Sequence, residues 1–321
     1  MSPEIKVKDL EKIYGDETAV NSISFKVEEG EIFGLLGPNG AGKTTTTAML
    51  STLVNITHGS AKVNGYDVTT EQNKVRDSIG VVFQETALDD WLTGQENMEF
   101  HARMYGIGKK KRKKKTEELL KLVDLKEHAK KQVKNYSGGM KRRLEIARGL
   151  LQEPKILFLD EPTLGLDAET RRDIWGYIQD LNKRKNMTII LTTHYMEEAD
   201  FLCDRAAIMQ GGDIIELDTP EKLKERLGGD IITVKVDGKT NDIVERLESF
   251  DWVNNIDIQD FELSITAKRS ETHIKDVFNI VNSSKSKIQS INLRKPSLED
   301  VFIRLTSEKR NLEENLEKGG I

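Results

Sequence analysis

The sequence lacks the features that mark secreted chains, cysteine-rich metal sites and membrane-spanning segments. Its 321 residues include a single cysteine, Cys203, which excludes an internal disulfide and a cysteine-rich metal site. No apolar run approaches the roughly 20 residues that span a bilayer, and the N-terminus lacks the apolar core of a signal peptide. A net charge of −5 argues against a surface that binds nucleic acid broadly. We therefore expect a protein of a reducing cytosol; if it serves a membrane, it does so from the aqueous side.

Against this background the segment 37–44, GPNGAGKT, fits the phosphate-binding pattern G-x-x-x-x-G-K-[ST]. It follows an apolar run at 32–36 that predicts a buried strand, and it opens a helix expected to end near residue 53. Glycines let backbone N–H groups surround an anion, and the helix N-terminus adds partial positive charge. The pattern places Lys43 at the outer phosphates and the Thr44 hydroxyl on Mg²⁺. A simple glycine turn is the alternative, which the strand–loop–helix context disfavours.

Polar side chains follow three other apolar strands at the point where each strand ends. They are Gln84, the pair Asp160 and Glu161, and His194. An α/β sheet binds its ligand at the carboxyl ends of its strands, so these positions favour a shared site with the phosphate loop. A lone histidine is more often structural, and only its place at a strand end favours a functional role here. The predicted strands span residues 80–83, 156–159 and 188–193.

Residues 88–150 are predicted to be helical and contain three features of interest. Residues 109–115 are an unbroken run of seven basic residues, and such a run is usually a solvated face or a linker. Two other interpretations stay open: contact with anionic lipid headgroups is the more specific one, and contact with nucleic acid is the other. Ser137-Gly138-Gly139 by itself predicts only a helix N-cap. Trp91 either packs inside this region or anchors a partner protein, and the sequence leaves both open.

The pattern changes near residue 230, which divides the chain into a domain at 1–229 and a second at 230–306. The second shows the order β-α-β-β-α-β, which is typical of a ferredoxin-like α+β fold. A last amphipathic helix follows at 298–305, and residues 307–321 form a charged tail. Every phosphate-facing motif ends by His194, so we expect the second domain to regulate or stabilise rather than to hydrolyse.

The motifs described so far, with Asp167, occur in one order between residues 37 and 194. Together they resemble the nucleotide-binding subunit of an ATP-binding cassette (ABC) transporter, over residues 4–225. Segments 136–140, 161–167 and 296–302 are most similar to the drug-resistance exporter branch, which includes the daunorubicin-resistance ATPases. Met140 departs from the glutamine of the commoner signature, so no glutamine contact is expected there. The resemblance implies an α/β P-loop NTPase fold, with a mixed sheet core and a helical subdomain at about 88–150, followed by the ferredoxin-like domain.

The resemblance also implies a role for each matching residue. Tyr14 would stack on adenine, Glu161 would polarise the attacking water and His194 would contact the γ-phosphate. Gln84 would touch Mg²⁺ or the water and would also face the membrane subunit. The phosphate-binding residues would be Gly37, Asn39, Gly40, Ala41, Gly42, Lys43, Thr44 and Thr45, and the metal-binding residues Thr44, Gln84 and Asp160. The residues acting on ATP held by the opposite protomer would be Ser137, Gly138 and Gly139, with Asp167 across the dimer seam.

The function implied is ATP hydrolysis that powers a separate membrane permease, a multidrug exporter of drugs or lipids. The cofactors would be ATP and Mg²⁺, the catalytic unit a homodimer, and the location the cytoplasmic face of the cell membrane. No nucleic-acid partner is expected. A soluble relative in DNA repair or translation is one alternative, but such proteins usually carry a coiled coil, zinc modules or two cassettes. An unrelated P-loop kinase is another, and Ser137-Gly138-Gly139 and His194 give no reason to prefer it.

Overall fold

The computed structural model describes residues 4–307 except 239, 260, 268–269 and 285. The chain divides into two compact units, Met1–Leu217 and Asp218–Ile321, which are described separately below. The charged tail expected at 307–321 lies outside the described residues, apart from Ser307.

The core of the first unit is a six-stranded sheet with the order β10-β9-β3-β8-β7-β6. Its central strands β3 (Ile32–Leu36), β7 (Ile156–Asp160) and β8 (Thr188–Thr193) run parallel and are buried at every residue, as their apolar sequences predict. Leu36 pairs with Thr193 and Asp160 with Thr192, so the three strands end side by side. The other strands are β6 (Ile79–Val82), β9 (Arg205–Gln210) and β10 (Asp213–Asp218).

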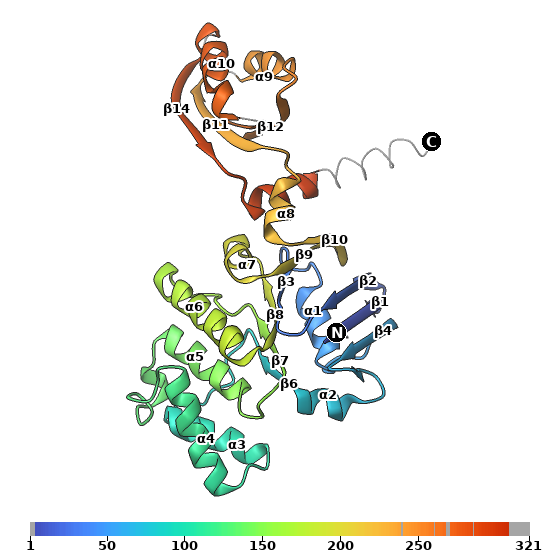
Figure 1. The fold of residues 1–321 in the computed structure, drawn as a ribbon, viewed down its shortest axis with the longest axis vertical. Helices are drawn as coiled ribbons and strands as arrows, with labels where there is room; N and C mark the ends of the chain where they lie inside the picture. The colour runs from blue at the N-terminus through green and yellow to red at the C-terminus, as the bar shows by residue number, and fades with distance from the viewer. Residues whose placement is uncertain (1–3, 239, 260, 268–269, 285, 308–321) are drawn as a thin grey trace. The chain divides into compact units, whose positions relative to one another are not determined.

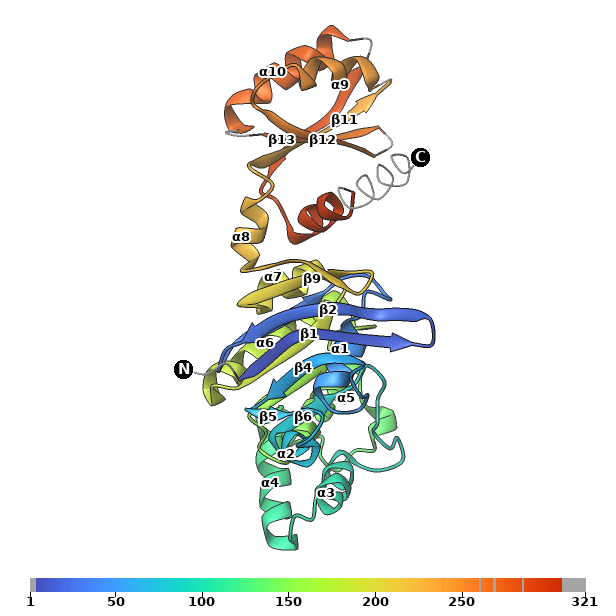
Figure 2. The same cartoon turned by 90° about the vertical axis from the view of Figure 1, so that its right-hand side faces the viewer.

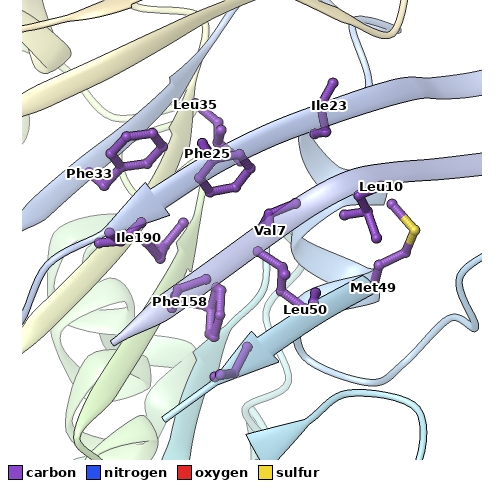
Figure 3. Packing of buried hydrophobic residues seen from close by; sticks show 14 of the residues in the cluster. Val7, Leu10, Ile23, Phe25, Phe33, Leu35, Met49, Leu50, Phe158 and Ile190 are labelled. Carbon is purple, nitrogen blue, oxygen red and sulfur yellow. The ribbon is translucent and has the colours of Figure 1, made fainter. Parts of the chain in front are cut away.

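A second sheet in this unit has the order β2-β1-β4-β5 and is antiparallel (Figure 2). Its strands are β1 (Ile5–Tyr14), β2 (Glu17–Val27), β4 (His58–Val63) and β5 (Tyr66–Asp67). One continuous apolar cluster joins the two sheets and helix α1 (Lys43–Leu50), and within it the rings of Phe25 and Phe33 stack at 5.2 Å (Figure 3). This packing holds both ends of the phosphate loop. Helix α1 ends at Leu50, short of the predicted end near residue 53.

The predicted helical region is confirmed. It contains α3 (Gly94–Met104), α4 (Lys109–Leu122), a short 3₁₀ turn (Val133–Asn135) and α5 (Gly138–Gly149). A reciprocal cap between Thr93 and Glu96 starts α3, and α3, α4 and α5 pack against one another (Figure 1). Trp91, which precedes α3, is 71% exposed, so the alternative that it packs inside the region is wrong. The unit's remaining helices are α2 (Gln72–Ser78), α6 (Ala168–Lys185) and α7 (Met196–Leu202).

The second unit has the β-α-β-β-α-β order that its sequence pattern predicts. Its antiparallel sheet has the order β12-β13-β11-β14, in which strands distant in sequence pair at the centre. Apolar side chains of β11 pack with Val277 and Val281 of α10. The elements are α8 (Pro220–Glu225), β11 (Asp230–Asp237), α9 (Asn241–Glu248), β12 (Val253–Gln259), β13 (Glu262–Ala267), α10 (Ser270–Ser283) and β14 (Lys287–Arg294), with a helix at 298–307.

The division between the units lies at 217/218, before the boundary at 229/230 that the sequence suggested. Hydrogen bonds from side chains of the second unit to the backbone at residues 227–228 explain why the boundary lies earlier. The Asn254 side chain donates a hydrogen bond to the Gly228 carbonyl at 2.9 Å, and Arg304 donates one to the Leu227 carbonyl at 3.2 Å. The segment that contains α8 is therefore held by the second unit.

Candidate active site

The phosphate loop connects β3 to α1 and depends on glycine at its first position. Gly37 has φ +153°, and a Cβ there would lie 2.2 Å from the Met209 carbonyl oxygen of the neighbouring strand. The Gly37 N–H also donates to the Thr193 carbonyl at 3.3 Å. Any side chain at this position would therefore push the loop away from the sheet.

Lys43, the first residue of α1, folds back over the loop. Its Nζ donates to the carbonyl oxygens of Gly37 at 2.7 Å and Pro38 at 3.0 Å, and lies 3.6 Å from Oε1 of Glu161. Burial lowers the pKa of Lys43, and the Glu161 carboxylate opposes that shift. A cation so placed in a poorly hydrated loop favours an anionic ligand.

Asp160 ends β7 and lies next to the first turn of α1. The Thr44 hydroxyl donates to Oδ1 of Asp160 at 3.2 Å, and the Thr192 hydroxyl donates to the same oxygen. These hydroxyl and carboxylate oxygens suit Mg²⁺, which binds few protein ligands and completes its shell with water and phosphate oxygens. Within the described parts of the chain, no cluster of three or more His, Cys, Asp or Glu residues could hold a metal alone. The residues present therefore fit a Mg²⁺ that is shared with a nucleotide.

Glu161 and His194 face each other from the ends of β7 and β8. Nδ1 of His194 lies 2.8 Å from Oε2 of Glu161. Glu161 has φ +48°, a left-handed conformation that is unusual for a residue with a side chain, and its N–H donates to the Thr192 carbonyl at 3.1 Å. Backbone strain of this kind clusters at functional sites.

A cavity of about 570 Å³ unites most of the predicted site residues. Tyr14 is 47% exposed, with Nζ of Lys12 4.7 Å from its ring centroid. The predicted residues lining the cavity are Tyr14, Asn39, Gly40, Ala41, Gly42, Lys43, Thr44, Thr45, Gln84, Glu161 and His194. The sequence missed five others, Glu17, Thr18, Ala19, Leu164 and Gly211. Of these, only Leu164 lies in a segment that carries the family resemblance, 161–167.

Six predicted residues do not line this cavity. They are Gly37 and Asp160, described above, and the signature residues Ser137, Gly138 and Gly139 with Asp167. Ser137 caps α5 by accepting the Met140 N–H at 3.2 Å, and Asp167 caps α6 by accepting the Thr170 N–H at 2.9 Å. A Cβ on Gly139 would lie 2.4 Å from Cγ2 of Thr170, so the starts of α5 and α6 touch closely. The signature residues and Asp167 form a second group within the same chain.

Arg142 was not predicted, although it contacts more of the site's backbone than any motif residue does among those described. It is 6% exposed on α5 and donates to the carbonyls of Phe83, Asp160, Glu161 and Pro162 at 2.7 to 3.1 Å. It also pairs with Glu145 at 3.1 Å. Burial lowers the pKa of Arg142. Its neighbours in sequence are also basic, so nothing in the sequence singled it out.

Glu198 is the second residue that sequence reasoning missed. It is fully buried on α7, and its Oε1 accepts hydrogen bonds from the Thr163 hydroxyl and from Nε1 of Trp175, both at 2.8 Å. Burial raises the pKa of Glu198. The carboxyl thus ties the segment that follows Glu161 to α6 and α7.

Comparison with known proteins agrees with this geometry. Residues 20–164 match the family model "ABC transporter", and residues 219–306 match "ATP-binding protein DrrA1-3-like, C-terminal domain". The linearmycin resistance ATP-binding protein LnrL of Bacillus subtilis is 40% identical, over 94% of this chain and 98% of that protein. The daunorubicin resistance ATP-binding protein DrrA3 of Streptomyces coeruleorubidus is 37% identical, over 97% and 98%.

Solved structures show the same cassette. A dimeric, post-hydrolysis form of the ATP-binding cassette MJ0796, bound to ADP and Pi, has a TM-score of 0.61 at 29% identity, over 67% of this chain and 98% of that one. The CbiO1 protein of Clostridium perfringens, part of an ABC transporter complex, has a TM-score of 0.66 at 28% identity, over 71% and 94%.

The fold and the phosphate loop define a P-loop ATPase. More closely, the chain belongs to the ATP-binding subunits of ABC transporters, and it is homologous to their drug-resistance ATPases. The family and fold expected from the sequence are thereby confirmed, and so is the expected ATPase activity. Across the described residues, no helix is both long and apolar enough to cross a bilayer.

Proposed function

We propose that two copies of this chain close around ATP and drive a separate permease at the cytoplasmic face of the membrane, exporting amphiphilic drug-like compounds. The observation that supports a dimer is the separation of the predicted site residues into two groups. The cavity holds the phosphate loop, whereas Ser137 and Asp167 lie outside it and are free to act on a second copy. The named resistance of the relatives to linearmycin and daunorubicin supports the class of cargo.

The proposed chemistry is transfer of the γ-phosphoryl group of ATP to water, which needs in-line placement and charge neutralisation. Glu161 would orient the water, while Lys43 and His194 would offset charge on the γ-phosphate oxygens. The contact of His194 with Glu161 supports this arrangement, because it fixes the carboxylate next to the expected phosphate position. Thr44, Asp160 and Gln84 would hold Mg²⁺, which neutralises phosphate charge when bound. Closure by the partner's signature would complete the site.

The contact with the permease is proposed at Gln84 and Trp91. Gln84 lines the cavity and is therefore within reach of a nucleotide bound there. Trp91 follows shortly after it, is 71% exposed, and lies under Nζ of Lys134 at 4.2 Å from its ring centroid. An exposed aromatic ring, already oriented by its neighbours, is suited to anchor a partner protein.

Purification of the tagged chain from its native membranes tests this proposal. The wild-type chain should co-elute with one polytopic membrane protein, and Trp91→Ala should lose it while keeping basal ATPase activity and thermal stability. Phe278→Ala is the matched control, since it removes an aromatic side chain that is 48% exposed on the second unit. If no polytopic protein co-elutes with the wild-type chain, the proposed permease is wrong. If Trp91→Ala retains it, the contact lies elsewhere.

A further inference from the structure

The run of seven basic residues at 109–115 is not a linker, because it forms the first two turns of α4. The helix begins after Gly108, which provides no side-chain cap. Cations at a helix N-terminus oppose the helix dipole, and like charges four residues apart, such as Lys109 and Lys113, repel each other. The basic run therefore destabilises the helix that contains it. The reason for so many basic residues at this position must be an interaction with something other than the helix itself.

Packing uses only two of the seven basic residues. Arg112 is buried and donates to the Ile107 carbonyl at 3.1 Å, and Lys115 is buried and pairs with Glu153 at 2.8 Å. The other five are exposed to solvent. They are Lys109, Lys110, Lys111, Lys113 and Lys114. Within the described chain, Lys109, Lys110 and Lys113 form no ion pair, so their charge is directed to solvent.

Exposed apolar side chains are found at the end of α3, the helix that precedes these lysines in the chain. Helix α3 packs against α4 (Figures 1 and 2), and the end of α3 exposes Phe100 by 53% and Met104 by 69%. Tyr105, the C-cap of α3, is 46% exposed. Aromatic and apolar side chains next to lysines are the combination found in proteins that lie on the surface of anionic membranes.

A cavity of about 390 Å³ adjoins this face and shares Lys113 with it. Thr116 lines the cavity and is 2% exposed, yet its hydroxyl has no hydrogen-bond partner among the described residues. A phosphate oxygen would accept that hydrogen bond and would be neutralised by the lysines. The lining also includes Gln95, Glu117, Leu120, Lys126, Glu127, Ala129 and Lys130, of which Lys126 and Glu117 approach to 3.7 Å.

We propose that this face docks onto a bilayer that contains anionic phospholipid. The exposed lysines attract the headgroups, Phe100, Met104 and Tyr105 enter the interface, and one headgroup phosphate enters the cavity at Thr116. The net charge of −5 repels polyanions in general, so the attraction is local to this face. The exposed apolar side chains favour lipid over nucleic acid. Such docking adds a contact with the membrane that is independent of any permease.

Co-sedimentation of the full chain with vesicles tests the proposal without a permease, so its failure is distinct from failure of the transport function. The chain should bind vesicles of phosphatidylcholine mixed with phosphatidylglycerol and not vesicles of phosphatidylcholine alone. The triple variant Lys109→Gln/Lys110→Gln/Lys113→Gln should bind about 100-fold more weakly, because each lysine near an anionic surface contributes about fivefold. ATPase activity should not change.

The matched control removes the same charge from β1 and β2 with Lys6→Gln/Lys8→Gln/Lys26→Gln, all exposed, and should bind like wild type. Thr116→Val, which keeps the shape of the side chain, should weaken binding about fivefold through loss of one hydrogen bond. High salt screens the attraction between lysines and headgroups but not the insertion of apolar side chains. Met104→Ser should therefore reduce the vesicle binding that remains at high salt. Equal binding to neutral vesicles, or equal loss in both triple variants, would overturn the proposal. Tighter binding to single-stranded RNA than to the anionic vesicles would also overturn it and identify a nucleic-acid surface.

Discussion

Nδ1 of His194 lies 2.8 Å from Oε2 of Glu161, a contact that joins the carboxyl ends of two adjacent parallel strands. The register of β7 on β8 makes this contact possible, because Asp160 pairs with Thr192 and each of the two side chains follows its strand by one residue. Glu161 also lies 3.6 Å from Nζ of Lys43. The carboxylate is thus held between an imidazole and an ammonium group at the mouth of the phosphate loop.

Replacing Glu161 by glutamine should leave ATP binding intact and slow turnover. The expected loss is about 10²- to 10⁴-fold, typical of removing a general base. The variant should accumulate as an ATP-bound dimer, which size-exclusion chromatography with ATP would detect. Glu29→Gln, at an exposed position before β3, is the control and should hydrolyse ATP normally. Turnover near the wild-type rate in Glu161→Gln would show that another group orients the water.

Mixed protomers should reveal whether the two groups of site residues act on each other across a dimer. Lys43→Ala and Ser137→Ala should each be inactive alone. A mixture should recover part of the ATPase activity, because a mixed dimer contains one site with an intact phosphate loop and an intact signature. Heterodimer formation is verified by differential tagging. If mixed dimers form but hydrolyse no ATP, the residues do not act in trans.

Arg142 should be required for both stability and turnover, because its guanidinium holds the backbone at residues 160–162. Arg142→Met should lower the free energy of unfolding by about 3–5 kcal/mol, the cost of leaving Glu145 charged and unpaired in the interior. Arg142→Met/Glu145→Met should regain much of that stability without regaining activity, since the carbonyls still lack their donor. Denaturant unfolding and steady-state ATPase assays separate the two effects.

The neighbouring arginine provides the control for this test. Arg143 is half-buried and makes a single hydrogen bond, to the Val123 carbonyl at 3.4 Å. Arg143→Met should therefore cost about 1 kcal/mol or less and leave turnover unchanged. Similar losses from both substitutions would mean that Arg142 contributes only generally, through charge or helix stability.

Glu198 should make folding stability depend on pH. Burial raises its pKa above the ordinary value of 4.5, so above pH 4.5 the folded state binds more protons than the unfolded state. The contribution of this group to the free energy of unfolding therefore falls as pH rises through that range. Glu198→Gln keeps an oxygen for the Thr163 and Trp175 donors and removes the titration. Its stability relative to wild type should rise with pH, measured by denaturant unfolding between about pH 5 and 8.

Glu197→Gln is the comparison for that series, since the Glu197 side chain is 66% exposed. Its stability should follow the wild-type pH dependence. If Glu198→Gln runs parallel to wild type as well, Glu198 has the same pKa in the folded and unfolded states, and burial has no net effect on it.

The first unit should bind nucleotide without the second. Every residue that lines the candidate cavity lies between Tyr14 and Gly211. A chain ending at Leu217 should fold cooperatively and keep an ATP dissociation constant within about threefold of wild type, a difference of about 0.7 kcal/mol. A chain ending at Gly229 tests the alternative boundary. Loss of nucleotide affinity in both would show that residues after Gly229 contribute to the site.

Much of the fold was determined by short segments of sequence. The apolar runs of β3, β7 and β8 could only be buried strands, and the glycines of the phosphate loop allow φ values that other residues avoid. Because parallel strands place their carboxyl ends at one edge, Asp160, Glu161 and His194 could be grouped from sequence alone. These inferences succeed because they depend on backbone conformation and on residues close together in the chain.

The tertiary structure decided which distant segments touch. Arg142 reaches Phe83 and the turn after β7 only because α5 packs against that edge of the sheet, and its basic neighbours carry the same sequence signal. Trp91 is exposed because the helical region packs without covering it. The hydrophobicity of a tryptophan does not by itself show whether its side chain is buried or exposed. The separation of Ser137 from the cavity likewise depends on the placement of α5. Side-chain burial and long-range contacts result from the sum of many weak packing interactions, so no single segment of the sequence encodes them.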